Sequence, residues 1–381
     1  MLDRAGMSTP GKQSRLVSLP PVTLGPGEQR QNDRSRNAVD GESSARMQIA
    51  RAACTRVPGK AKGASAPVIC HLSLTTPFFL LALLALPPVA RADKATDHLT
   101  RGNTLAVQGN WAGAVTEYRQ ALRARPAFPE AHYNLANALN AEHDRAGAIA
   151  EYRLALKLKP DYVPAHNNLA LALRGSGDLA GAAGELREAI RLQPDYSEAH
   201  FNLAEVLTAT GNLKGAVAEY RLALVINPGD ARAAAGLGYA LTKAGDLEHA
   251  VLQLRQAVKL GPDDPGAHLK LANALADSGD FDAAIAEYRL ALLLEPNDAA
   301  ARDDLGLAFE ENGDLTRAIA EYRAAIRSQP ADAAAHHNLG RALEILGDLH
   351  GAAEQYQSAS GLDPANSRYK TDATRLATTK Q

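Results

Sequence analysis

Residues 131–160 read AHYNLANALNAEHDRAGAIAEYRLALKLKP and contain one complete structural unit. Leu135 and Leu139 stand four residues apart, which places both on one face of a first helix. A second helix is expected over about 146–159, and it aligns small and aromatic residues on one stripe, Ala148, Tyr152 and Ala155. Pro160 follows, and proline cannot continue a helix. The stretch predicts a helix–turn–helix whose apolar face is too wide to be buried within the pair.

The turn between the two helices carries a helix-ending signal in most units. Glycine followed by Asp or Asn, as in Gly177-Asp178 and Gly313-Asp314, suits a left-handed C-cap and then the N-cap of the next helix. His143 stands in this place in the unit quoted above.

The unit recurs at a fixed interval of 34 residues. The closing prolines are Pro126, Pro160, Pro194, Pro228, Pro262, Pro296, Pro330 and Pro364. The first alanine of the second-helix stripe keeps the same interval, at Ala114, Ala148, Ala182, Ala216, Ala250, Ala284, Ala318 and Ala352. This periodicity predicts a stack in which each unit buries its apolar face against its neighbours.

These residues resemble the tetratricopeptide repeat (TPR) family, whose 34-residue pattern runs from an aromatic through Leu-Gly, Tyr, Ala and Phe to Pro. Leu339-Gly340, Leu135-Ala136, Tyr152 and Pro160 fill matching places. The opening aromatic is replaced by histidine in most repeats, at His132, His166, His200, His268 and His336.

The resemblance implies an all-α fold, a right-handed α-solenoid of about eight repeats over 93–366. Its first repeat departs most, with Arg101-Gly102 in place of Leu-Gly. Residues 367–381 are predicted to be a C-terminal capping helix or tail.

The first 92 residues differ from the rest in charge. They carry 12 basic and 5 acidic side chains, against 29 and 38 in residues 93–381. Residues 1–69 have no aromatic residue and no sustained apolar period, so they are predicted to be a disordered basic region. Met47 is an alternative start.

Residues 70–92 have the parts of a secretory signal peptide: preceding basic residues, the apolar run 78–86 and the small residues of Ala90-Arg91-Ala92. Cleavage after Ala92 and export to the periplasm or medium are predicted. The alternative is a membrane anchor over 72–90, although a bilayer span takes about 20 apolar residues and this window contains three prolines.

Several function classes are excluded by composition and spacing. Lys plus Arg total 41 against 43 Asp plus Glu, which lacks the basic excess of a general nucleic-acid binder. Cys54 and Cys70 leave with the signal peptide, so no thiol chemistry is expected. The histidines stand in neighbouring helices about 8–10 Å apart, too far to share a zinc ion at about 2.0 Å. No catalytic, cofactor-binding or metal-binding residues are therefore predicted.

One column of asparagines points to the binding face. It comprises Asn134, Asn168, Asn202 and Asn338 and is interrupted by Gly236, Lys270 and Asp304. It resembles the ladder in the TPR superhelix of O-linked N-acetylglucosamine transferase, where amides hold an extended substrate; the resemblance does not include that enzyme's catalytic domain. An amide both donates and accepts, which matches a peptide group. The alternative is that asparagine is simply the repeat's consensus residue.

The predicted peptide-binding residues of the concave groove are Tyr133, Asn134, Asn137, Asn168, Phe201, Asn202, Tyr239, Lys270, Asp303, Asp304, Glu310, Glu311 and Asn338. Amides and aromatics precede the acids, which predicts a bound segment with apolar residues toward one end and Lys or Arg toward the other. Pairing of Lys270 with Asp303 or Asp304 is the alternative use of these charges.

The predicted function is a non-catalytic protein-interaction scaffold that binds an extended polypeptide in this groove. An enzyme or enzyme subunit using the groove for its substrate is one alternative. A membrane-tethered assembly factor is another, if residues 72–90 are retained.

Overall fold

The computed structural model describes residues 94–378, which form seventeen helices and no strand. The helices are α2 (Lys94–Val107), α3 (Trp111–Ala124), α4 (Pro129–Ala141), α5 (Arg145–Leu158), α6 (Val163–Gly175), α7 (Leu179–Leu192), α8 (Ser197–Ala209), α9 (Leu213–Ile226), α10 (Ala231–Ala244), α11 (Leu247–Leu260), α12 (Pro265–Asp277), α13 (Phe281–Leu294), α14 (Ala299–Glu311), α15 (Leu315–Ser328), α16 (Ala333–Leu346), α17 (Leu349–Leu362) and α18 (Ser367–Thr378). The prediction of an all-helical repeat array is confirmed.

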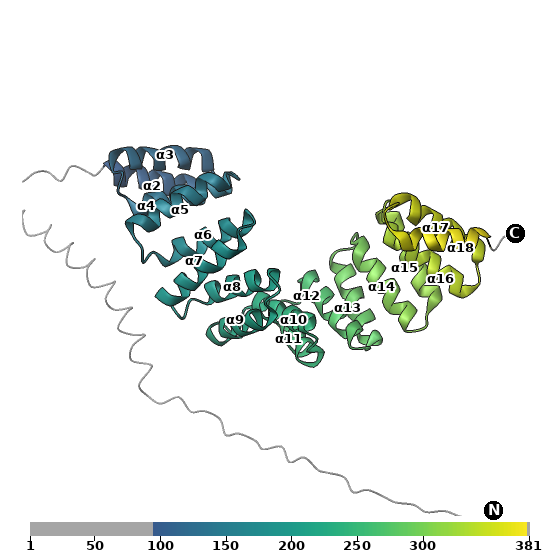
Figure 1. The fold of residues 1–381 in the computed structure, drawn as a ribbon. Helices are drawn as coiled ribbons and strands as arrows, with labels where there is room; N and C mark the ends of the chain where they lie inside the picture. The colour runs from purple at the N-terminus through teal and green to yellow at the C-terminus, as the bar shows by residue number, and fades with distance from the viewer. Residues whose placement is uncertain (1–93, 379–381) are drawn as a thin grey trace, which may run out of the picture. The chain divides into compact units, whose positions relative to one another are not determined.

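Each even-numbered helix from α2 to α16 is the first helix of a repeat, and the next helix is its partner. Repeat one is α2–α3, repeat two is α4–α5, and repeat eight is α16–α17. Each first helix packs on its own partner, and each one after α2 also packs on the second helix of the preceding repeat. Most consecutive first helices also touch (Figure 1). We call the surface formed by the row of first helices the first-helix face.

The turn chemistry of each repeat follows from the sequence signals. Asp144 caps α5 by accepting a hydrogen bond from the backbone N–H of Gly147 at 2.9 Å. His143, in the glycine place, has φ +66° and is the one non-glycine residue with positive φ in the described chain. Asn, Asp and His tolerate this conformation better than branched residues do, so the exception at His143 keeps the same turn.

Small residues let the two helices of each repeat approach closely. Ala148, Tyr152 and Ala155 are all buried, as the stripe on the second helix predicts. In repeat seven a Cβ built on Gly306 would lie 2.6 Å from the ring of Tyr322, so only glycine fits there. The core is therefore continuous along the array and consists largely of alanine, leucine and one tyrosine or leucine per repeat.

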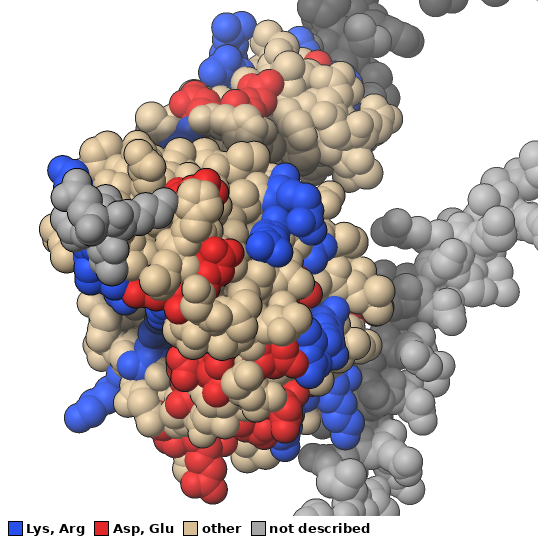
Figure 2. Space-filling model, turned by 90° about the vertical axis from the view of Figure 1, so that its right-hand side faces the viewer, with Lys and Arg blue, Asp and Glu red and all other residues tan. Residues whose placement is uncertain are grey.

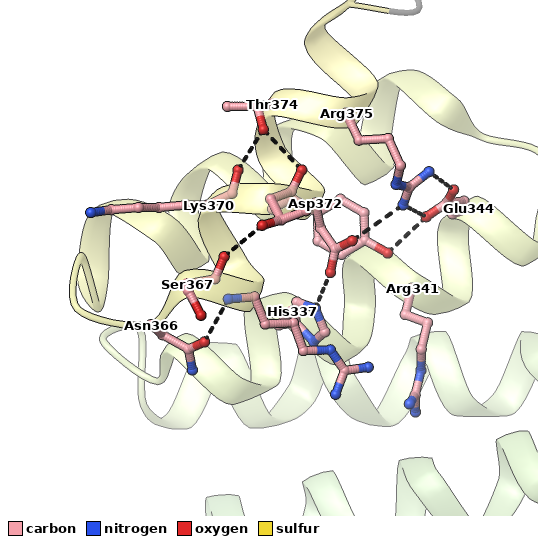
Figure 3. A network of polar contacts seen from close by, with 12 residues as sticks. His337, Arg341, Glu344, Asn366, Ser367, Lys370, Asp372, Thr374 and Arg375 are labelled. Atoms are coloured by element: carbon pink, nitrogen blue, oxygen red, sulfur yellow. Dashed lines mark hydrogen bonds and ion pairs between the residues drawn. The ribbon is translucent and has the colours of Figure 1, made fainter.

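Helix α18 covers the C-terminal end of the array. Arg375 donates to both carboxylate oxygens of Glu344, with Nη1 2.6 Å from Oε1, and Asp372 lies 2.9 Å from Nε2 of His337 (Figure 3). Leu376 is 5% exposed. These contacts join α18 to α16 and shield the last repeat from water.

The predicted basic region 1–69 and the predicted signal or anchor segment 70–92 lie outside the described residues. None of the helices within 94–378 is long and apolar enough to cross a bilayer. Figure 2 shows acidic and basic side chains beside each other on the face it presents, without a surface of one sign.

Candidate functional site

The predicted asparagine column is bonded within the protein. Asn168 Nδ2 donates to the hydroxyl of Tyr133 and to Oδ1 of Asn137, both at 3.0 Å. The hydroxyl of Tyr152 donates to the same Asn137 oxygen at 2.5 Å. A carbonyl oxygen has two lone pairs, so Asn137 Oδ1 has none left for a ligand. These side chains link repeat two to repeat three.

The other members of the column also reach back to the preceding repeat. Their Nδ2 atoms donate from Asn134 to Asn103 at 2.9 Å, from Asn202 to Asn167 at 2.8 Å, and from Asn338 to Asp303 at 2.8 Å. Asn202 is 2% exposed and its neighbour Phe201 is 8% exposed. Both side chains are buried between repeats and present little surface to a ligand, whereas the prediction placed them in the groove.

The predicted acidic patch of repeat seven is largely neutralised. Glu310 accepts hydrogen bonds from the Tyr322 hydroxyl at 2.9 Å and from Arg341 Nη2 at 3.1 Å. Asp303 holds Asn338, and burial raises the pKa of its carboxyl to about 6. Asp304 and Glu311 make no hydrogen bond or ion pair within residues 94–378, and Oδ1 of Asp303 is buried there without a hydrogen-bond partner.

Lys270 does not pair with either aspartate. Its Nζ donates to the carbonyl of Gly266 at 3.3 Å, and no ion pair joins it to Asp303 or Asp304. Asp304 itself has no hydrogen-bond partner among residues 94–378, although burial raises the pKa of its carboxyl. Lys270 and Asp304 therefore both lie on the first-helix face without an ion-pair partner within residues 94–378.

A hollow of about 330 Å³ opens on this face, and Lys270 and Asp304 both line it. It is lined by Tyr239, Thr242 and Lys243 of α10, Lys270, Asn273, Ala276 and Asp277 of α12, Tyr288 of α13, and Asp304 and Leu307 of α14. We call it the central hollow. Tyr239 and Leu307 expose 40% and 38% of their surface, so the hollow has apolar walls as well as charges.

The hollow coincides with the gap in the asparagine column. A Cβ on Gly236 would already lie 2.5 Å from Tyr220, so repeat five has no side chain at that position to bridge repeats. Lys270 and Asp304 occupy the next two places and bond no neighbouring repeat. The asparagine column therefore links adjacent repeats elsewhere, but no such hydrogen bond is made from this position in repeats five to seven.

Three predicted site residues line the central hollow, and three important ones were missed. The predicted residues are Tyr239, Lys270 and Asp304; the missed residues are Lys243, Asp277 and Leu307. A sequence signal for two of them exists. The position of Lys243 and Asp277 is small in repeats two to four, where it holds Ala141, Gly175 and Ala209.

A second hollow, of about 360 Å³, lies on the first-helix face at the N-terminal end of the array. Its lining comprises Asn103, Ala106, Val107, Trp111, Tyr118, Asn134 and Asn137. Val107 is 91% exposed and Trp111 is 37% exposed. Predicted residues Asn134 and Asn137 thus border an apolar surface.

A third hollow, of about 530 Å³, borders α11 and the turn between α12 and α13. Leu252, His249 and Asp280 are among its lining residues. It contains none of the predicted site residues, and its walls come mainly from a second helix. Size alone does not make it the better candidate.

The histidine column has a structural role. His132 Nε2 faces the Pro126 carbonyl at 3.0 Å and Nδ1 faces a Glu151 carboxylate oxygen at 2.6 Å. Both ring nitrogens meet acceptors, which suits the protonated imidazolium, and the Glu151 hydrogen bond raises the pKa of His132. In repeat seven Arg302 makes the same two contacts, to Glu321 and the Pro296 carbonyl.

Comparison with known proteins agrees with this geometry. Profiles of the tetratricopeptide repeat match residues 102–141, 129–162, 167–231, 238–279, 269–333 and 304–367. No curated protein matches the chain.

Solved structures share the fold. The crystal structure of the APC/C hetero-tetramer Cut9–Hcn1 aligns with a TM-score of 0.51 at 16% identity, covering 76% of this chain and 57% of that one. YrrB, described as a TPR protein with an unusual peptide-binding site, aligns at 0.44 and 22% identity, over 49% of this chain and 96% of YrrB. MamA aligns at 0.41 and 23%, over 42% of this chain and 95% of MamA.

The repeat profiles span most of residues 102–367, and the helix pairs recur through the same region. The chain belongs to the tetratricopeptide repeat family, a family of protein-interaction scaffolds.

Proposed function

We propose that this protein binds an extended polypeptide segment on its first-helix face, with the central hollow as the principal contact, and that it performs no chemistry on it. The hollow crosses three consecutive first helices, α10, α12 and α14. An extended segment laid across them would meet Tyr239, then the α12 side chains, then Leu307.

The observation that carries this proposal is the contrast between paired and unpaired charges. Two pairs of charged groups elsewhere on the face bond each other across adjacent repeats, Arg174 with Glu205 and Arg341 with Glu310. Around the central hollow no ion pair within residues 94–378 neutralises Lys270 or Asp304, and the Asp304 carboxylate accepts no hydrogen bond there. Polar groups in a partly buried hollow gain most from a ligand that completes their bonding.

The lining argues for binding rather than catalysis. It has two acids, Asp277 and Asp304, but no histidine, cysteine or serine to form a nucleophile–base pair. The tyrosine hydroxyl of Tyr288 donates to Asn273 and is not available as a free proton donor.

The proposal includes export. The apolar run 78–86 followed by Ala90-Arg91-Ala92 supports a cleaved signal peptide, and the mature chain would begin at Asp93. A partner would then be a protein outside the cytoplasm. Retention of residues 72–90 as an anchor would place the same repeats at a membrane surface.

Site-specific photo-crosslinking in the protein's own host tests the binding face. The full chain carries p-benzoylphenylalanine at Leu307, in the central hollow, or at Leu252, which is 61% exposed on α11. We expect a crosslinked protein from the Leu307 position that diminishes with Tyr239→Ala. Crosslinks from Leu252 alone would place the binding surface on the second helices and overturn the proposal.

A further inference from the structure

Four charged side chains surround the central hollow in an ordered pattern. Lys270 and Asp304 occupy equivalent positions of consecutive repeats, 34 residues apart. Lys243 and Asp277 form a second such pair, on the adjacent helix position. In both pairs the lysine belongs to the repeat nearer the N-terminus.

The pattern makes the hollow a dipole along the array. Its positive side lies on α10 and α12, and its negative side lies on α12 and α14. No other stretch of the described first-helix face places two lysines before two aspartates in this way. The corresponding positions of repeats one to four and eight hold no charged residue: Thr100, Asn134, Asn168, Asn202 and Asn338 at the first, and Val107, Ala141, Gly175, Ala209 and Ile345 at the second.

None of the four charges is neutralised by an ion pair within residues 94–378. The Lys243 ammonium lies 5.5 Å from the centre of the Tyr239 ring, and Lys270 has only the Gly266 carbonyl. Neither Asp277 nor Asp304 makes a hydrogen bond to the described protein. Electrostatic complementarity mainly confers selectivity, so these charges discriminate among ligands.

Resting on the proposed function, we infer that the central hollow selects a dipolar peptide segment, with an acidic side chain beside Lys243 and Lys270 and a basic side chain beside Asp277 and Asp304. The exposed Tyr239 and Leu307 take an apolar residue of the same segment. Purely acidic or purely basic segments leave one side of the hollow facing a like charge.

The spacing of the two charges in the segment follows from the fold. Helices α10 and α12, which carry Lys243 and Asp277, pack on each other. Packed helices lie about 8–10 Å apart, and an extended chain rises about 3.3 Å per residue. The acid and the base are therefore expected about three residues apart, in either chain direction. A peptide selection experiment measures this separation of the two charges directly.

The test is selection from a phage-displayed library of random linear peptides on the mature chain. We expect enrichment of sequences with opposite charges about three residues apart. Peptides that enrich without such a pair, but still lose binding to Tyr239→Ala, would overturn the dipolar inference and leave the proposed function standing. If no peptide is enriched above an uncoated surface, the result contradicts both the dipolar inference and the proposed function.

Two matched double variants identify the sides of the hollow. Fluorescence anisotropy of a selected dipolar peptide should show roughly a tenfold loss of affinity, about 1.4 kcal/mol, for Lys243→Gln with Lys270→Gln. Repeating the selection on Asp277→Asn with Asp304→Asn should shift enrichment to acidic peptides.

The control makes the same charge change outside the hollow. Lys157→Gln with Lys214→Gln alters exposed lysines of second helices, and affinity should stay within about twofold because surface charges outside the interface contribute little. An equal loss in this control would show a general charge effect and contradict the inference.

Discussion

Replacing Asp304 by asparagine should restore the inter-repeat ladder at its gap. Asn168, Asn137 and Tyr152 stand four repeats before Asp304, Asn273 and Tyr288, and the Tyr288 hydroxyl already donates to Asn273 as Tyr152 does to Asn137. The amide introduced by Asp304→Asn would therefore find Asn273 Oδ1 in the place where Asn168 finds Asn137. One hydrogen bond forms that the present carboxylate cannot make.

The expected gain is about 1 kcal/mol in the free energy of unfolding, the net value of a typical intramolecular hydrogen bond. A further contribution comes from removing a partly buried carboxylate, whose pKa burial raises above its ordinary value. Burial of this carboxylate costs nothing below about pH 3.9, where Asp304 is protonated in both the folded and the unfolded state. The cost grows as pH rises above that value and is complete above the folded-state pKa. The stabilisation should therefore be largest at neutral pH and shrink on acidification.

Thermal and urea unfolding followed by circular dichroism measures the change. About 1 kcal/mol corresponds to roughly 2–4 °C in melting temperature for a domain of this order of size. Asn168→Asp makes the reverse change at the equivalent position and should destabilise, by about 1–3 kcal/mol, because it breaks two hydrogen bonds. If Asp304→Asn were neutral at pH 7 while Asn168→Asp destabilised, the four-repeat equivalence would be refuted.

Three other predictions follow from the fold and sequence. The Glu151 hydrogen bond raises the pKa of His132, so the stability from this pair is full below about pH 6.5 and is lost as pH rises through the folded-state value; Glu151→Gln should flatten this part of the pH–stability curve in urea titrations. Ala216→Leu should overpack the buried contact between helices at about 1–3 kcal/mol, whereas Ala218→Leu, exposed on the same helix, should be nearly neutral in the same titration. N-terminal sequencing of protein from its own host should begin at Asp93, and soluble cytoplasmic protein retaining residues 47–92 would contradict export.

Repetition made the fold predictable from sequence. A proline every 34 residues with an alanine in fixed phase leaves one arrangement that buries every apolar stripe, so Ala148, Tyr152 and Ala155 are buried as expected. Even the unusual His143 follows the repeat, taking positive φ in the glycine place. The buried stripe and the positive-φ turn depend on a pattern within one repeat, and the same pattern recurs in each of the eight repeats.

The asparagine column shows where sequence reasoning stopped. The 34-residue register predicts the position of these asparagines on the first helix, but it does not predict which groups their amides bond. The partners lie 31 or 35 residues earlier, on flanking turns of the preceding first helix. A sequence trace exists in hindsight: Asn137 is followed by Tyr152 after 15 residues and by Asn168 after 31, and these three side chains form one bonded group.

The sequence by itself determined the helix pairs, their number and their order, because periodicity and turn signals act within one repeat. Only the tertiary structure decided which polar groups face a ligand. Asp303 and Asp304 are adjacent in sequence, yet one holds Asn338 and the other lines the central hollow. Adjacent helical residues point about 100° apart, so the two carboxylates meet different surroundings. Which of them finds a hydrogen-bond partner depends on the side chains that the neighbouring repeat places there, and not on the local sequence.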